Sequence, residues 1–348
     1  MSTAADSMAE TTATADSNES AITFDETTLP IEANGSETVK LPFRCPTADS
    51  NPVLPPKLVG DQESKYKQVL EAVLKWTDIP VTSKKNAERT PLSENEQMWL
   101  TRDCLLRYLR ATKWNVHDAI VRLEKTLVWR REYGIEKHTS DYINIEMATG
   151  KMVVQGFDNN GRPCLYMDPS KQNTEKSPRQ IQALVFLLER MIDLMEPGQE
   201  SLAMLANFKT TKVSQAPGVG QGKETLSILQ NHYPERLGRA MVINIPFAIN
   251  GFFKLIMPFI DPVTREKLKF NEDLRQHVPP SQLLDCFGGD VKFEYDHEKF
   301  WPAFMSLANK RREEYRQRWI KGGKRIGERE SYLRGGDEKS ISEESAQE

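Results

Sequence analysis

The segment from Asp261 to Lys267 has the residue types and spacing of a site for an oxyanion such as phosphate. Its sequence is Asp-Pro-Val-Thr-Arg-Glu-Lys. Aspartate is a favoured N-cap and proline a favoured first residue, so the segment predicts that a helix begins here. Thr264 then falls at the third helical position, with Lys267 one turn later on the same side. Free N–H groups, a hydroxyl and an ammonium at one helix start can bind phosphate; a helix start without a ligand is the alternative.

A carboxylate that could act with this segment is Glu235, in the sequence Tyr233-Pro234-Glu235-Arg236. There it can accept hydrogen bonds from the hydroxyls of a polyol, or orient Lys267. The alternative is a surface ion pair, and such pairs contribute little to stability.

The chain between these two segments is markedly apolar from Pro246 to Ile260. A membrane-spanning helix requires ~20 apolar residues, whereas this run is shorter and is interrupted by Asn250, Gly251 and Lys254. We therefore expect a protein that stays in water and conceals an apolar interior.

Motifs for catalysis are incomplete in this sequence. The segment from Gly218 to Thr225 resembles a phosphate-binding loop, but Pro217 and Glu224 occupy positions that require glycine and Ser or Thr. The sequence has no Gly-x-Ser-x-Gly turn, and its five histidines lack the spacing of metal ligands. We predict a protein that is not an enzyme and that needs neither metal nor cofactor.

Strands and helices alternate from residue 151 onward. Segments 151–157 and 162–167 flank Asp158-Asn159-Asn160-Gly161, which indicates a β-hairpin. Later segments have the composition of buried strands at 201–208 and 240–245, and of helices at 181–195 and 223–231. This order predicts an α/β fold with a mixed or mostly parallel sheet.

A small all-α region is predicted before the sheet, because apolar residues recur at helical spacing in 101–110 and 116–133, and Gly134 is a natural C-cap. Segment 303–329 is helical and basic, which is typical of a solvated face or of attraction to anionic headgroups. We expect five parts: a disordered acidic tail (1–55), a helical region (56–140), the α/β domain (141–302), a basic C-terminal helix (303–334) and a disordered tail (335–348).

Composition narrows the choice of partners and compartment. The net charge of -3 disfavours nucleic acid as a partner. The four cysteines are scattered and the first residues do not form a signal segment, which favours the reducing cytoplasm.

Several motifs, in order along the chain, resemble the CRAL-TRIO lipid-binding family, and most closely its fungal phosphatidylinositol transfer proteins. The resemblance covers about residues 95 to 305. The motifs are Arg107-Tyr-Leu-Arg-Ala-Thr-Lys-Trp, Trp129-Arg-Arg-Glu-Tyr-Gly, Asn231-His-Tyr-Pro-Glu-Arg-Leu-Gly-Arg, Ile243-Asn-Ile-Pro-Phe, Lys254-Leu-Ile-Met-Pro-Phe-Ile-Asp-Pro-Val-Thr-Arg-Glu-Lys and Gly288-Gly289.

The resemblance implies a bowl of sheet and helices that is closed by a mobile helical gate over residues 247–260. The gate residues expected to face acyl chains or the membrane are Phe247, Phe252, Phe253, Ile256, Phe259 and Ile260. Residues that hold phosphatidylinositol in the family fall on Arg130, Glu235, Thr264 and Lys267. In this assignment the last two bind the phosphodiester. The first two surround the inositol and lock the helical region onto the lipid domain.

The expected second ligand differs from that of family members that exchange phosphatidylcholine. Those members hold its headgroup with polar and aromatic side chains, and the matching positions here are Val154, Leu165, Leu202 and Met204. A buried charged headgroup would lack partners there, whereas an apolar lining suits a sterol. The pattern resembles the pleiotropic-drug-resistance branch, whose members carry phosphatidylinositol and sterol. Drift among core residues is the alternative.

We therefore expect an intermembrane lipid transfer protein that exchanges phosphatidylinositol for a second hydrophobic ligand, sterol rather than phosphatidylcholine. The alternative function is a sensor or scaffold that presents phosphatidylinositol to a lipid kinase without bulk transfer. By resemblance, the protein is cytoplasmic and touches membranes transiently, at the endoplasmic reticulum, plasma membrane or lipid droplets.

Overall fold

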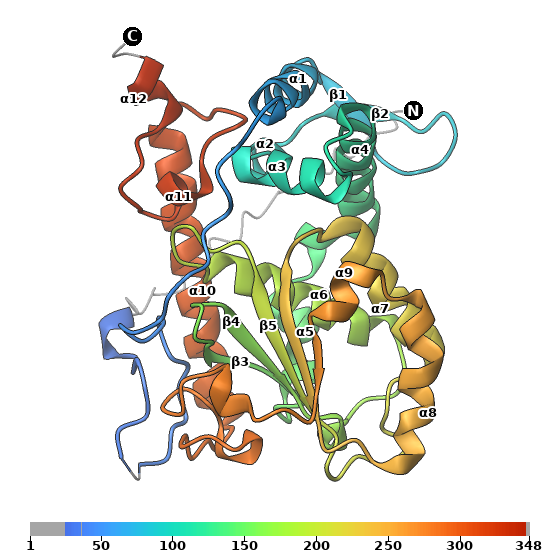
Figure 1. Cartoon of the computed structure of the whole chain (residues 1–348), viewed down its shortest axis with the longest axis vertical. Coiled ribbons are helices and arrows are strands. Elements are labelled where there is room, and N and C mark those ends of the chain that lie inside the picture. Colours follow the sequence, from blue (N-terminus) through green and yellow to red (C-terminus); the bar gives the residue numbers. More distant parts are fainter. Residues whose placement is uncertain (1–24, 36, 346–348) are drawn as a thin grey trace, which may run out of the picture.

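A five-stranded sheet forms the centre of the computed structural model, which describes residues 25–35 and 37–345. Its strands are β3 (Met152–Phe157), β4 (Pro163–Met167), β5 (Leu202–Asn207), β6 (Leu237–Ile243) and β7 (Leu268–Phe270). They lie side by side in chain order (Figure 1). β3 pairs antiparallel with β4, and the later neighbours pair in parallel. The prediction of an α/β fold with a mixed, mostly parallel sheet is confirmed.

The hairpin between β3 and β4 forms at its predicted turn. Gly161 has a φ of 69°, a left-handed conformation that glycine adopts without steric cost. The Asp158 Oδ1 accepts hydrogen bonds from the backbone N–H groups of Asn160 at 2.9 Å and Arg162 at 3.0 Å. This turn joins two strands on which Val154 pairs with Leu165.

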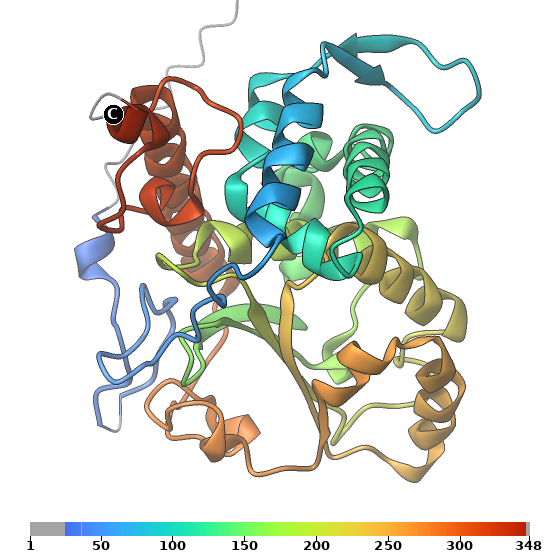
Figure 2. The same cartoon turned by 45° about the horizontal axis from the view of Figure 1, so that its top comes forward.

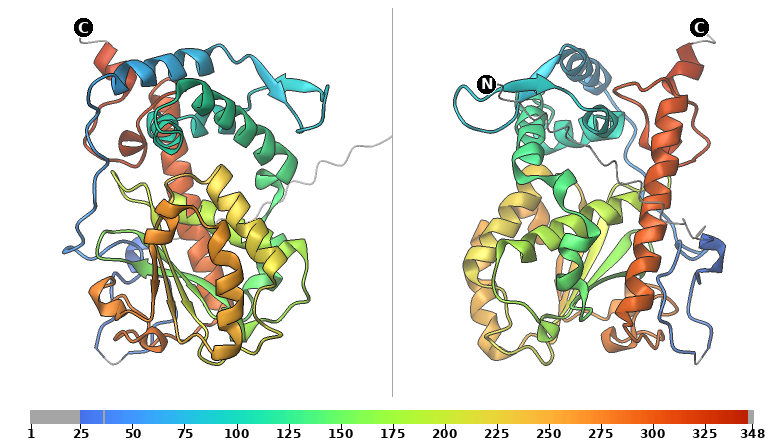
Figure 3. Two further views of the ribbon diagram at one scale, coloured as in Figure 1. Left: turned by 45° about the vertical axis from the view of Figure 1, so that its right-hand side comes forward. Right: turned by 180° about the vertical axis from the view of Figure 1, so that it is seen from behind.

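The two faces of the sheet have different covers. Helices α5 (Ser140–Met147), α6 (Pro178–Asp193) and α10 (His297–Lys321) pack on one face around a large apolar cluster. They lie in front of the strands in the right-hand view of Figure 3, which shows the molecule from behind. The other face packs against segment 274–291 and Phe43. The short 3-10 helices of the α/β domain are η3 (Pro169–Lys171), η5 (Leu274–Gln276) and η6 (Asp285–Phe287).

Further helices border the sheet on the side of β6 and β7 (Figure 1). They are α7 (Val219–His232), α8 (Phe247–Ile256), the 3-10 helix η4 (Met257–Phe259) and α9 (Pro262–Glu266). Phe252 and Phe253 of α8 pack on a cluster that includes Ala206 and Val242 from the sheet. The predicted gate therefore lies against the sheet in this conformation.

A mainly helical unit with its own core lies across the end of the sheet where β5 and β6 begin (Figure 2). Its elements are α1 (Gln62–Leu74), β1 (Asp78–Pro80), β2 (Arg89–Pro91), α2 (Glu94–Trp99), α3 (Arg102–Ala111), α4 (Val116–Tyr133) and η2 (Ile135–Lys137). Gly134 caps α4 with a φ of 78°. The unit contains the two helices that the apolar periodicity predicts. It also contains the antiparallel pair of β1 and β2, so the region is mainly helical rather than all-α as expected.

The N-terminal segment differs from the expected disorder over residues 25–35 and 37–55. It begins with η1 (Glu26–Thr28), and Leu29 and Phe43 are buried in the core clusters of the α/β domain. Gln155 supports its backbone: Oε1 accepts from Phe43 N–H at 3.2 Å, and Nε2 donates to the Leu41 carbonyl at 3.1 Å. A few anchoring side chains order a segment whose average composition is polar. The expectation for residues 1–24 lies outside the described residues.

The C-terminal segment also differs from the expected helix (303–334) and tail (335–348). The long helix α10 ends at Lys321, and α11 (Glu330–Leu333) follows it. The expected tail contains α12 (Ile341–Ser345), and Ser340 is only 1% exposed. The expectation for residues 346–348 lies outside the described residues. The Arg329 guanidinium pairs with the Glu344 carboxylate at 2.6 Å, which holds α12 beside the chain before α11. Arg329 and Glu344 are 15 residues apart, further than one helical turn, so composition alone does not reveal their contact.

Across the ranges 25–35 and 37–345, none of the helices combines the length and apolar character needed to cross a bilayer.

Candidate functional site

Thr264 and Lys267 lie in one helical turn, as the sequence predicts. Asp261 is the N-cap of α9, and its Oδ1 accepts a hydrogen bond from the Thr264 N–H at 2.9 Å. Partial burial disfavours the charge on Asp261, but the hydrogen bonds from Thr264 outweigh this effect and lower its pKa. The Asp261 N–H donates to Gln230 Oε1 of α7 at 2.9 Å, which ties the start of α9 to the α/β domain.

The Lys267 ammonium has no ion-pair or hydrogen-bond partner among residues 25–35 and 37–345. Its backbone is held in place, because its carbonyl accepts a hydrogen bond from the Ala240 N–H at 2.9 Å where β6 and β7 begin to pair. The side chains of Thr264 and Lys267 are partly exposed. A fixed backbone with an uncommitted cation is suited to binding an anion.

Arg130 joins the helical region to the α/β domain. Its guanidinium donates to both Glu189 oxygens, at 2.8 and 2.9 Å, and lies 5.3 Å from the Trp99 ring centre. Tyr233 donates its hydroxyl to Glu189 Oε1 at 2.7 Å. Burial disfavours the Glu189 charge, but Arg130 and Tyr233 outweigh it, so the pKa of Glu189 falls to about 2. The expected locking role of Arg130 thus has a defined partner.

Glu235 lies at the same junction in a separate ion pair. Its backbone has a φ of 62°, and its side chain is 35% exposed. Its Oε2 lies 3.8 Å from Arg110 Nε of α3, and Arg110 also donates to Glu200 at 2.7 Å. Among the residues that the structure describes, no hydrogen bond or ion pair connects any two of Arg130, Glu235, Thr264 and Lys267.

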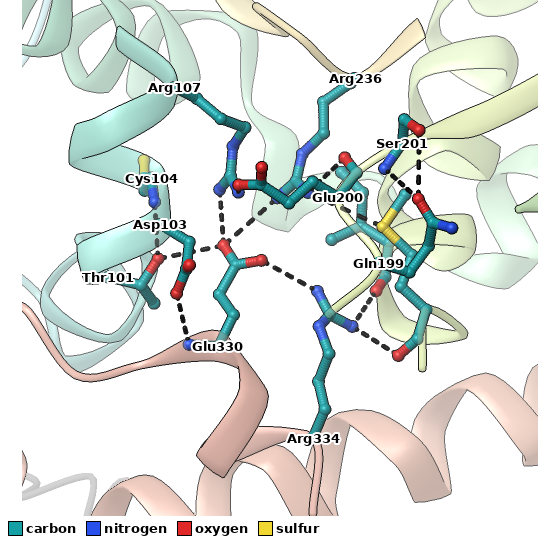
Figure 4. Close-up of polar contacts among 12 residues, drawn as sticks. Thr101, Asp103, Cys104, Arg107, Gln199, Glu200, Ser201, Arg236, Glu330 and Arg334 are labelled. Atoms are coloured by element: carbon teal, nitrogen blue, oxygen red, sulfur yellow. Dashed lines mark hydrogen bonds and ion pairs between the residues drawn. The ribbon is translucent and has the colours of Figure 1, made fainter. Parts of the chain in front are cut away.

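A buried charge network at this junction was not predicted. Glu330 Oε1 accepts from Arg107 at 2.5 Å and Thr101 at 3.0 Å, and lies 3.5 Å from the Arg236 guanidinium. The Arg334 guanidinium lies 3.4 Å from Oε2 of the same carboxylate. Figure 4 shows the helical region, the α/β domain and the C-terminal segment converging on Glu330. Arg107 and Arg236 fall within the resemblance motifs, whereas Glu330 has no sequence signal.

The predicted gate presents two kinds of apolar side chain. Phe253 contacts Phe208 and Phe270 of the sheet side with ring centres 5.6 and 5.7 Å apart, and Ile256 and Ile260 are buried. Other side chains of the same segment face outward: Phe247 is 93% exposed, and Leu255 and Phe259 are also exposed. The inward set covers the sheet, and the outward set leaves apolar area in water.

The four residues predicted for the second ligand lie together in one buried cluster. Val154 pairs with Leu165 across β3 and β4, and Leu165 is aligned with Met204 across β4 and β5. Leu202 lies two residues before Met204 on the same strand, and all four belong to the cluster that packs on α6. The structure thus brings together positions that are up to 50 residues apart in the chain.

A cavity of ≈ 200 Å³ opens beside this cluster. Its walls combine apolar side chains, among them Met152, Met167 and Leu184, with polar ones. They comprise Lys151, Met152, Met167, Pro169, Gln172, Thr174, Lys176, Gln180, Ile181, Leu184, Ser214, Gln215, Ala216, Pro217, Gln221 and Thr225. The four predicted second-ligand residues contact packed side chains instead. This volume is below the ~300–1,000 Å³ of typical small-molecule sites, so a two-chain lipid does not fit in this conformation.

An apolar interior beneath a covering helix, with a phosphate-compatible helix start beside it, is the arrangement of a lipid-binding protein. Residues 147–289 match the family model described as "CRAL/TRIO domain", and residues 65–125 match "CRAL/TRIO, N-terminal domain". The chain belongs to the CRAL-TRIO family, whose members bind lipids and are not enzymes.

Curated relatives extend this similarity over most of the chain. The CRAL-TRIO domain-containing protein C23B6.04c of Schizosaccharomyces pombe is 52% identical over 312 residues, which cover 89% of this chain and 31% of that protein. Phosphatidylinositol transfer protein PDR17 of Saccharomyces cerevisiae is 39% identical over 295 residues, which cover 79% of this chain and 84% of that protein. The chain thus spans under a third of the first relative and most of the second.

Proposed function

We propose that this protein carries one phosphatidylinositol at a time between membranes and exchanges it for a second hydrophobic ligand. The observation that carries the proposal is the uncommitted Lys267 ammonium, next to Thr264, at the end of the segment that covers the apolar interior. The 39% identity to a relative named as a phosphatidylinositol transfer protein supports the choice of lipid.

In this proposal the headgroup binds where α9 begins. Thr264 donates its hydroxyl and Lys267 its ammonium to the phosphodiester, because charge-assisted hydrogen bonds are the strongest available to an oxyanion. Arg130 and Glu235 border the inositol and hold the helical region against the α/β domain through Glu189 and Arg110.

Loading requires α8 to move away from the sheet, because the ≈ 200 Å³ cavity is too small for two acyl chains. The Phe253 contacts with Phe208 and Phe270 separate in this step. Burying each methylene contributes ~0.8 kcal/mol, and the membrane offers a similar gain. Exchange is therefore nearly balanced and needs no ATP, so headgroup contacts select the lipid.

The second ligand in this proposal is a sterol rather than phosphatidylcholine. Val154, Leu165, Leu202 and Met204 provide no hydrogen-bond donor and no aromatic ring. A phosphocholine group placed among them would bury charge without partners, which is costly. A rigid, largely apolar molecule meets no such penalty once the interior opens.

Transient membrane contact in this proposal uses the exposed apolar side chains Phe247, Leu255 and Phe259. Basic side chains accompany them: the Lys223 ammonium lies 4.0 Å from the Phe259 ring centre, and Lys254 is on α8 itself. Apolar groups beside cations suit the boundary between headgroups and acyl chains of an anionic bilayer.

Lipid movement between donor and acceptor vesicles tests the headgroup assignment. Glu235→Ala combined with Lys267→Ala should abolish phosphatidylinositol transfer. The surface pair Lys269→Ala with Glu272→Ala, whose atoms are 4.0 Å apart, is the matched control and should retain it. Equal transfer by both double variants contradicts the assignment. Lipid binding by the unaltered protein without transfer would favour presentation to a lipid kinase instead.

The same assay tests the second ligand. Leu202→Ser combined with Met204→Thr should gain measurable phosphatidylcholine transfer, because the two hydroxyls supply donors to the buried phosphate. The unaltered protein should transfer sterol. A variant that folds but gains no phosphatidylcholine transfer refutes the argument from apolar lining.

A further inference from the structure

The glycine-rich segment that resembles a phosphate-binding loop forms the first turns of α7. Gly218 is the N-cap of this helix, and Gly220 and Gly222 follow inside it. Glycine in the interior of a helix is destabilising relative to alanine, so these two residues need an explanation. Because the segment lacks the residues that a phosphate-binding loop requires, the explanation lies in what α7 packs against.

α7 lies beside α8, the first part of the predicted gate (Figure 1). A Cβ atom added at Gly222 would lie 2.9 Å from Ile256 Cδ1 and 3.0 Å from Phe252 Cζ. Phe252 and Ile256 are four residues apart and share one face of α8. Their side chains therefore occupy the space that a larger residue at position 222 would fill.

Gly220, two residues earlier in α7, has different surroundings. A Cβ atom added there meets no atom within 4 Å, and the residue is exposed. Neither Gly220 nor Gly222 has a positive φ, so the backbone at both positions accepts an ordinary L-residue. The two positions thus differ in the space around them and not in backbone conformation.

The contact between α7 and α8 lacks hydrogen bonds, whereas the next part of the gate is tied to α7 by them. Gln230 Nε2 donates to the Phe259 carbonyl at 3.2 Å, and Gln230 Oε1 accepts from the Asp261 N–H at 2.9 Å. Over the described ranges, no hydrogen bond or ion pair joins α7 to α8. Apolar surfaces can separate and meet again without leaving polar groups unpaired, so α8 is the part of the gate that can leave α7.

We propose that Gly222 is the seat of the gate, the position on α7 against which α8 closes, and that the space there sets how often the gate opens. A larger side chain pushes Phe252 and Ile256 away from α7, which weakens the closed state relative to the open one. Gly222 acts through α8 and is a positioning residue. Its effect on lipid exchange rests on the proposed carrier function, since loading requires α8 to move.

Hydrogen exchange of the α8 amides in the full chain measures gate opening without any lipid. We expect about tenfold faster exchange in Gly222→Leu than in the unaltered protein, because overpacking favours the open gate. Gly220→Leu is the matched control, since it makes the same change in the same helix where space is open, and its α8 amides should exchange at the unaltered rate. Equal α8 exchange in the two variants, or a rise of the same size in the amides of β5, overturns the role of Gly222.

A double-mutant cycle tests whether the contact is direct. Ile256→Val removes Cδ1, the atom that lies 2.9 Å from the added Cβ. In that background Gly222→Ala should accelerate exchange less than it does in the unaltered protein, because residues in contact have coupled effects. Effects that simply multiply overturn the direct contact.

Transfer of phosphatidylinositol between vesicles then tests the link to lipid exchange. Gly222→Leu should transfer faster than the unaltered protein, and Gly220→Leu should match it. Unchanged transfer by Gly222→Leu, despite faster hydrogen exchange, overturns the claim that the seat sets the rate. Absence of transfer by the unaltered protein refutes the carrier function instead, and the hydrogen-exchange result then decides the seat by itself.

Discussion

Glu330→Ala removes the acid on which the buried network converges. In the unaltered protein its carboxylate accepts from Arg107 at 2.5 Å and Thr101 at 3.0 Å, and lies 3.5 Å from Arg236 and 3.4 Å from Arg334. These partners belong to the helical region, the α/β domain and the C-terminal segment. The substitution therefore weakens the junction of all three parts.

The size of the expected stability loss depends on the partners that the arginines keep in the variant. Breaking a buried ion pair by removing one partner costs roughly 3–5 kcal/mol, because the other charge remains buried. Arg107 keeps Glu200 at 2.8 Å, and Arg236 keeps the Glu200 carbonyl at 2.9 Å. We therefore expect a loss at the lower end, about 3 kcal/mol in the free energy of unfolding at pH 7.

The loss should depend on pH in one direction. Burial disfavours the charge on Glu330, but the surrounding arginines outweigh it, so its pKa lies well below the usual value. A depressed pKa contributes stability above the unfolded-state value of ~4.3, and this contribution disappears as the pH falls toward the folded-state value. The difference in free energy of unfolding between the unaltered protein and the variant should thus be largest at pH 7 and should shrink below about pH 4.

Urea unfolding, followed by circular dichroism, measures this difference as a shift in midpoint. Glu338→Ala is the control, since Glu338 is an exposed acid in the same segment, and it should change stability by less than about 0.5 kcal/mol. A loss below about 1 kcal/mol for Glu330→Ala at pH 7, the size expected of a surface pair, would refute the reasoning.

Three other substitutions test separate parts of the structure. Glu189→Gln should lower the free energy of unfolding by about 3 kcal/mol at pH 7, because the pKa of Glu189 falls from 4.5 to about 2 beside Arg130. Urea midpoints should show that this difference in stability disappears between about pH 4.5 and pH 2. A loss of stability that does not depend on pH contradicts the ion pair. Phe247→Ser should reduce cosedimentation with anionic vesicles at unchanged stability, because the ring is 93% exposed; unchanged cosedimentation argues against this membrane contact. Gly289→Ala should destabilise by about 4 kcal/mol or more, because the new Cβ would lie 1.8 Å from the Leu283 carbonyl oxygen; a normal melting temperature would show that the backbone relaxes there.

Local signals account for the elements that the sequence predicts correctly. The hairpin at Asp158–Gly161, the helix that begins after Asp261 and the helix that ends at Gly134 each depend on residues within one turn of each other. Runs of apolar residues likewise indicate which strands are buried, because both faces of the sheet are covered. The α/β class and the helical turn that holds Thr264 and Lys267 could therefore be predicted from the sequence.

Local sequence does not predict which acidic residue pairs with which arginine. Arg130 pairs with Glu189, 59 residues away, and Arg107 pairs with Glu330, 223 residues away. Neither acid differs in its local sequence from the many solvated acids of the chain. Ion pairs between distant segments form because the fold brings the charges together in a site of low dielectric constant, where an unpaired charge is costly.

Neighbouring residues are enough to predict strands β3 to β6, the apolar segment 246–260 and the anion-compatible helix start, whereas β7 and the hairpin of β1 and β2 were not predicted. The tertiary structure was needed to show that Leu29 and Phe43 are buried in the core clusters of the α/β domain. It was also needed to show that Val154, Leu165, Leu202 and Met204 are packed in one cluster. It alone also placed Glu330 among three arginines. Burial and charge pairing are properties of surfaces that meet only after the chain has folded, so no local pattern specifies them.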